Sequence, residues 1–144
     1  MQHKSVDAVT KTIIIAAEEL FMKATDTGIK RILKAFIYSR DGFVSAYKSE
    51  TALRQDIIVF ILFSAVALCL DLPIWQKAIL ISSLLFIIIM ELVNTAVEVV
   101  IDRISPDYHE LSKKAKDIGS MLVLLSFVNA LILWGAFLYP LFFK

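Results

Sequence analysis

One stretch constrains the fold more than any other: residues 75–101 are predominantly apolar over a length that crosses a membrane. A helix that spans a bilayer needs about 20 such residues. Hydrophobic residues make up 58% of the chain, which is more than a soluble domain of this size contains. We therefore predict an integral membrane protein. The net charge of only +1 gives no indication of a nucleic-acid partner.

Two further apolar segments complete the predicted architecture. One precedes the 75–101 stretch and is free of charge from residue 57 to residue 70, and the other closes the chain. We extend the first across Asp71, because apolar residues continue beyond it. The expected fold is all-α, with three transmembrane helices at about residues 56–73, 75–101 and 118–143.

The distribution of basic residues predicts the orientation of these spans. Most of the lysines and arginines lie before the first span, and a smaller group lies between the second and the third. Basic residues concentrate on the cytoplasmic side of a membrane. We expect the N-terminus to be cytoplasmic and the C-terminus to face outward.

The segment that precedes the first span has the pattern of a surface helix. Residues 1–27 form an extension to which we assign no role, and we place the membrane domain at 28–144. Residues 29–48 are basic and amphipathic, which favours a position in the membrane interface, with packing against the helix bundle as the alternative. Asp41-Gly42 predicts a turn within this segment, after which a helical pattern resumes at Phe43.

Four polar residues form a stripe in the second half of the second span. Glu91, Asn94, Glu98 and Asp102 lie at about 0°, 300°, 340° and 20° around a helix with 100° per residue. Ionisable groups at membrane depth are costly and mostly mark function. We expect the functional site on this face of the helix.

Other polar residues are expected at the same cytoplasmic level: Glu50 before the first span, and Lys116, Asp117 and Ser120 at the start of the third. Between the second and third spans we expect a loop of about 15 residues, from 103 to 117, which is long for a connection in a bundle. Pro106 stops the preceding helix, and Asp107 can cap a short turn before residues 113–117.

These residue types fit phosphoryl transfer at the membrane boundary. Carboxylates such as Glu50 and Glu98 suit Mg²⁺, which commonly bridges to substrate phosphates. Glu91 lies about 10 Å deeper along the helix than Glu98, where an apolar environment suits a general base. A neighbouring lysine can balance phosphate charge. Neither a phosphate-binding glycine-rich loop nor a protein-kinase motif is present in the sequence.

Structural explanations compete with this hypothesis. The acidic stripe can pair with arginines and fix helix register in a non-enzymatic membrane module. Asn94 alone fits a hydrogen bond between helices, and Ser120 beside Gly119 fits a close contact of small residues.

The joined motif resembles the small prokaryotic diacylglycerol kinases of the Gram-negative type. The resemblance spans roughly residues 29–143 and is carried by Glu91-x-x-Asn94-Thr-Ala-x-Glu98-x-x-x-Asp102-Arg103, Tyr108-His109-Glu110-Leu111 and Ala115-Lys116-Asp117-x-Gly119-Ser120. It implies a homotrimer of three-span subunits, each with an N-terminal surface helix and with sites shared between subunits. It also implies ATP- and Mg²⁺-dependent phosphorylation of diacylglycerol to phosphatidic acid, by direct in-line transfer, at the cytoplasmic face of the inner membrane.

The resemblance also implies roles for individual residues. Glu91 is the expected base, and Glu50 and Glu98 are expected to hold the metal and to contact ATP. In the catalytic site, the resemblance implies that Asn94 lines the site and that Lys116 and Asp117 contact nucleotide. Further nucleotide contacts are expected from Arg31, Tyr38, Asp107, Tyr108 and His109. Lipid contacts are expected from Ala52, Leu53, Arg54, Gln55, Asp56 and Ser120. The same chemistry on undecaprenol, as in Gram-positive relatives, is the alternative.

Overall fold

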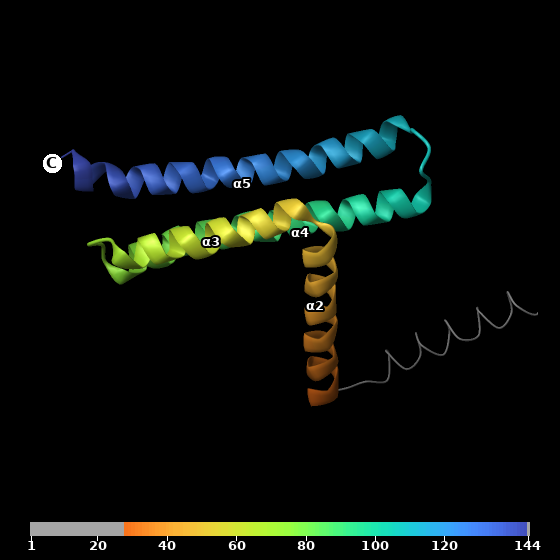
Figure 1. The fold of residues 1–144 in the computed structure, drawn as a ribbon, viewed down its shortest axis with the longest axis horizontal. Coiled ribbons are helices and arrows are strands. Elements are labelled where there is room, and N and C mark those ends of the chain that lie inside the picture. Colours follow the sequence, from red (N-terminus) through yellow and green to blue (C-terminus); the bar gives the residue numbers. More distant parts are fainter. Residues whose placement is uncertain (1–27, 144) are drawn as a thin grey trace, which may run out of the picture. The chain divides into compact units, whose positions relative to one another are not determined.

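The computed structural model describes residues 28–143, and every regular element in this range is a helix. The helices are α2 (Ile29–Ser49), α3 (Thr51–Cys69), α4 (Ile74–Ile104) and α5 (Glu110–Phe142), shown in Figure 1. Of these, α3, α4 and α5 are long and apolar enough to cross a membrane. The prediction of an all-α chain with three membrane-length helices is confirmed.

The predicted turn at Asp41-Gly42 is wrong, because α2 continues through both residues to Ser49. Glycine inside a helix costs about 1 kcal/mol relative to alanine, a penalty that does not interrupt this helix of 21 residues. The chain turns at Glu50 instead, whose extended backbone (φ −98°, ψ 119°) separates α2 from α3.

The chain divides into two compact units with their boundary between Phe43 and Val44, inside α2. The described part of the first unit is the start of α2, where apolar side chains are exposed: Ile29, Ile32, Leu33, Phe36 and Ile37. An exposed apolar face on a basic helix fits the interfacial position that we predict for it. Residues 1–27 lie outside the described part of the chain.

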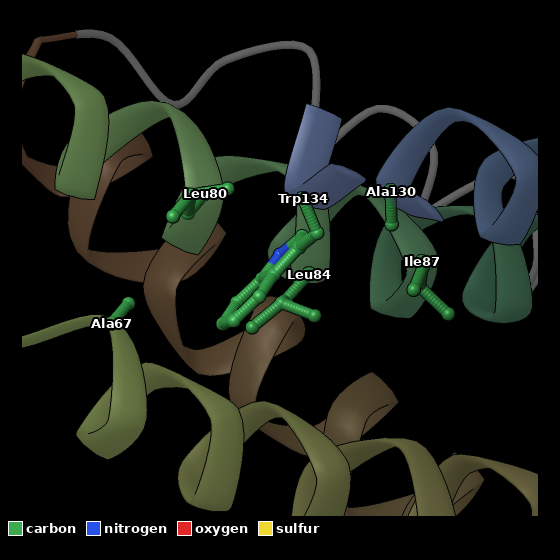
Figure 2. Packing of buried hydrophobic residues seen from close by; sticks show 6 residues of the cluster. All are labelled: Ala67, Leu80, Leu84, Ile87, Ala130 and Trp134. Atoms are coloured by element: carbon green, nitrogen blue, oxygen red, sulfur yellow. The ribbon is translucent and has the colours of Figure 1, made fainter. Parts of the chain in front are cut away.

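In the second unit, α4 packs against both α3 and α5. Figure 2 shows the core that joins them, with Ala67 from α3, Leu84 from α4 and Trp134 from α5 among its members. Each of these side chains is at most 9% exposed. The short connections leave the start of α3, the end of α4 and the start of α5 at one end of the bundle, which places the predicted polar residues at a common level.

The connection between α4 and α5 is shorter than predicted. Only residues 105–109 separate the two helices, instead of the expected 103–117. His109, not Asp107, caps α5: its Nδ1 accepts a hydrogen bond from the Leu111 N–H at 3.2 Å. Residues 110–117 are polar but include good helix formers, and Lys113 pairs with Asp117 one turn later. Polarity led to the prediction of a loop, whereas propensity and capping extend the helix.

The connection between α3 and α4 also differs from the prediction. The first span does not continue across Asp71, because α3 ends at Cys69 and α4 begins at Ile74 after Pro73. Lys77 donates a hydrogen bond from Nζ to the Leu68 carbonyl at 2.8 Å. That bond satisfies one of the carbonyls that the end of α3 leaves without a helical partner.

Candidate active site

A single unbroken helix carries the polar stripe. Glu91, Asn94, Glu98 and Asp102 all belong to α4, so the helical spacing on which the prediction depended is present. Glu91 is buried, with 7% of its surface exposed, whereas Asp102 is exposed. The stripe therefore runs from the interior of the helix bundle to the surface at one end.

Helix α3 and the residue before it bring two more carboxylates to the stripe. The charges of Glu50, Asp56 and Glu98 all lie close enough to Glu91 to act on it. Glu50 precedes the first turn of α3, and its side chain makes no capping hydrogen bond there, which leaves the carboxylate available to a ligand. Like charges repel at short range, so a cation bound near these carboxylates would offset their mutual repulsion.

Asn94 links the stripe to α5. Its Nδ2 donates a hydrogen bond to Glu98 Oε1 at 2.9 Å, while its buried Oδ1 has no hydrogen-bond partner among the described residues. Gly119 of α5 lies directly against this amide: a Cβ built on Gly119 would overlap Oδ1 and would lie 3.3 Å from Cγ. The position of the Asn94 amide thus depends on a glycine at 119, which sequence reasoning treated only as a small residue beside Ser120.

Replacing Gly119 with alanine is expected to push the Asn94 amide away and to break its hydrogen bond to Glu98. Inserting a methyl group into a packed contact of this kind costs about 1–3 kcal/mol. We expect Gly119→Ala to have a lower free energy of unfolding than Gly135→Ala by that amount, measured by SDS-induced unfolding in detergent, because both variants share the gain in helix propensity from alanine. Gly135→Ala is the matched control, since a Cβ there meets nothing within 4 Å. Equal stability of the two variants would contradict the proposed contact.

Lys116 extends the site from the start of α5. Its Nζ forms an ion pair with Asp102 Oδ1, and it lies close enough to Glu98 for the two charges to interact. Ser120 Oγ donates a hydrogen bond to the Lys116 carbonyl at 3.2 Å. The structure thus brings the predicted lysine to the end of the stripe.

Several other predicted site residues make contacts of their own. Asp117 points to Lys113 rather than to the stripe. Asp107 bonds Ser105 within the α4–α5 connection, where Tyr108 is 77% exposed. Arg31 and Tyr38 belong to the first compact unit.

The predicted lipid-contacting segment 52–56 divides by burial. Ala52 and Gln55 are exposed on α3, and Asp56 is half-buried near Glu91. Leu53 is fully buried and packs with Ala46 and Ile88. Leu53 therefore has a packing role in this structure, because its side chain offers no surface to a lipid.

The donor set at the stripe fits Mg²⁺ bound together with phosphate. Within residues 28–143 no three His, Cys, Asp or Glu side chains form a group that could hold a metal ion by themselves. Mg²⁺ is usually bound by one or two carboxylates, several waters and substrate phosphates rather than by an all-protein cage. Two glutamates, Glu50 and Glu98, are sufficient for such a site.

Comparison with known proteins decides the family. The sequence pattern of the prokaryotic diacylglycerol kinases matches residues 37–138. The chain belongs to this family. It is 40% identical over 121 residues to the diacylglycerol kinase of Escherichia coli K12, covering 84% of this chain and 99% of that protein.

More distant members of the family match over a similar range. The diacylglycerol kinase of Pseudomonas aeruginosa is 38% identical, over 78% of this chain and 91% of its own length. That of Helicobacter pylori J99 is 33% identical, over 81% and 91%. The family match includes Glu50, Asp56, Gly119 and all four residues of the stripe, and it begins after Arg31.

Proposed function

We propose that this chain transfers the γ-phosphoryl group of ATP to the free hydroxyl of diacylglycerol, giving phosphatidic acid and ADP. Kinase activity on diacylglycerol is supported by the family match and by relatives that carry this name. The observation that carries the mechanism is the buried Glu91 on the same helix as Glu98, in a stripe whose exposed end pairs with Lys116.

Glu91 is the proposed general base. Its carboxylate takes the proton of the lipid hydroxyl while the hydroxyl oxygen bonds to the γ-phosphorus. The bond from that phosphorus to the bridging oxygen breaks, and ADP leaves with the electron pair. In phosphoryl transfer, positioning and charge neutralisation supply most of the rate enhancement, so a small site built from side chains and helix ends is adequate.

Glu50 and Glu98 are the proposed holders of Mg²⁺. When bound, the ion neutralises charge on the phosphates and orients them. The Asn94 amide fixes one oxygen of Glu98 through its 2.9 Å hydrogen bond. Lys116 adds a positive charge at the Asp102 end of the stripe, where a phosphate would compete with Asp102 for its ammonium group.

The proposal includes a location and an assembly. We place the chain in the cell inner membrane as a multi-pass protein, with the polar end of the bundle in the cytoplasm. Basic residues near that end support this orientation. We propose a homotrimer with shared sites. In that assembly, we propose that Arg31, Tyr38, Asp107, Tyr108, His109 and Asp117 contact nucleotide, and that Ala52, Gln55, Asp56 and Ser120 lie near the lipid.

The acceptor lipid can be tested directly. The purified chain in mixed micelles is incubated with ATP, Mg²⁺ and either diacylglycerol or undecaprenol, and phosphate incorporation is measured for each lipid. We expect phosphorylation of diacylglycerol that stops when a chelator removes Mg²⁺. Phosphate on the polyprenol alone would reject the proposed acceptor, and full activity in excess chelator would reject the metal.

A further inference from the structure

Arg54 spans the junction between α2 and α3. Its Nη1 donates to the carbonyl oxygens of Tyr47 at 2.9 Å and Lys48 at 3.2 Å, and its Nη2 donates to Thr51 Oγ1 at 2.8 Å. The two carbonyls belong to the last turn of α2, where backbone acceptors have no helical partner. Thr51 is the first residue of α3. One guanidinium group therefore ties the end of one helix to the start of the next.

Glu50 is the single residue between these two helices. Its N–H donates to the Ala46 carbonyl at 2.8 Å, but its side chain makes no capping bond. The backbone at the junction therefore determines from which point, and on which side of the chain, the Glu50 side chain starts. Leu53 anchors the first turn of α3 on one side, in contact with Ala46 and Ile88, and Arg54 follows it in the same turn.

We propose that Arg54 is a positioning residue that acts through Glu50. It holds the α2–α3 junction at the angle that directs the Glu50 carboxylate toward the stripe on α4. The inference rests on the proposed function, since it takes Glu50 as a ligand of the nucleotide-bound metal. It also separates Arg54 from the lipid-contacting role that family resemblance implies, because both terminal nitrogens of its guanidinium are already bound to the chain's own oxygens.

The planar fork of arginine suits this role. Its donors lie in fixed directions, so it can bond two carbonyls and a hydroxyl at once, whereas a lysine ammonium is a single point on a flexible stem. Groups that orient a metal ligand typically affect metal affinity or activity by about 10- to 100-fold. We expect Arg54→Ala to raise the half-saturating Mg²⁺ concentration by an amount in that range, and Arg54→Lys to show a smaller increase. Thr51→Val removes one bond of three and should have a smaller effect in the same direction.

The test compares metal use with lipid use in the full-length chain. Initial rates are measured against Mg²⁺ and against diacylglycerol for Arg54→Ala, Arg54→Lys and Thr51→Val. Arg40→Ala is the matched control, since Arg40 pairs with its neighbour Asp41 on α2. We expect Arg54→Ala to raise the half-saturating Mg²⁺ concentration about tenfold, with the KM for diacylglycerol within about twofold. A raised lipid KM at unchanged Mg²⁺ dependence would overturn the proposal and support direct lipid contact.

A binding measurement separates this inference from the kinase assignment. Mn²⁺ binding in the presence of a non-hydrolysable ATP analogue, followed by electron paramagnetic resonance, does not require turnover. We expect weaker Mn²⁺ binding in Arg54→Ala, and no further weakening when Arg54→Ala is added to Glu50→Gln, because the two residues act as one unit. If the loss of Mn²⁺ affinity in the double variant equals the product of the two single losses, the two residues act independently. That result would overturn the proposal that Arg54 acts through Glu50. A wild-type chain that binds Mn²⁺ but phosphorylates no lipid would overturn the proposed function alone.

Discussion

Glu91→Gln is expected to lower the turnover of diacylglycerol phosphorylation by about 10²- to 10⁴-fold, the usual contribution of a general base. Glutamine keeps the size of the buried side chain but cannot accept the proton of the lipid hydroxyl. Removing one of four neighbouring negative charges also relieves repulsion within the cluster, so the helical fold should be retained. Turnover is measured in mixed micelles, and folding is measured by circular dichroism and SDS-induced unfolding.

Asp71→Asn is the matched control for this experiment. It makes the same change of charge in the connection between α3 and α4, at the opposite end of the bundle from the stripe. Its turnover should equal that of the wild type. If Glu91→Gln keeps full turnover, another group must take the proton, and Asp56 is then the first candidate because its charge lies close to Glu91.

Glu98→Gln is expected to lower turnover by about 10²-fold or more at low Mg²⁺, and high Mg²⁺ should restore part of the loss. The amide keeps an oxygen that can accept from Asn94 Nδ2, so the local packing survives. The charge that attracts the metal is lost, and metal ions contribute several kcal/mol to phosphoryl transfer. Initial rates over a range of Mg²⁺ concentrations measure the effect.

The Mg²⁺ dependence distinguishes Glu98 from Glu91. Added metal should not rescue Glu91→Gln, because a missing base is not replaced by a cation. Glu110→Gln is the control, as an exposed acid in the first turn of α5. A loss of turnover in Glu98→Gln that is unaffected by Mg²⁺ would mean that Glu98 does not hold the metal.

The sequence allowed the prediction of most of the helices because membrane length and helical periodicity are strong, local signals. The stripe was predictable for the same reason: once α4 is a helix, the spacing of Glu91, Asn94, Glu98 and Asp102 places them on one face. The predicted helix boundaries were wrong where the sequence signal was weak, as for a single glycine or a run of polar residues. Gly42 does not break α2, and residues 110–117 are helical although polar.

The sequence predicted that Lys116 lies at the level of the stripe, but it did not predict most of the individual contacts between helices. The proximity of Asp56 to Glu91, and the close approach of Gly119 to Asn94, depend on how α3 and α5 pack against α4. The role of Arg54 depends on where α2 ends, which the predicted turn at Asp41-Gly42 had placed a full eight residues too early. A family motif identifies which residues matter, but it does not show which of them bind one another.

The lengths of the three membrane helices affect the lipid around the site. The charge-free part of α3, residues 57–69, spans only about 20 Å at 1.5 Å per residue, against about 30 Å for the hydrocarbon layer. A bilayer adapts to a short apolar segment by becoming thinner beside it. We therefore expect the headgroup layer to dip along α3 toward Asp56, the charged residue that precedes this short segment. A diacylglycerol hydroxyl would then reach the proposed base, Glu91, at a local depression in the membrane surface, without leaving the layer in which its acyl chains are anchored.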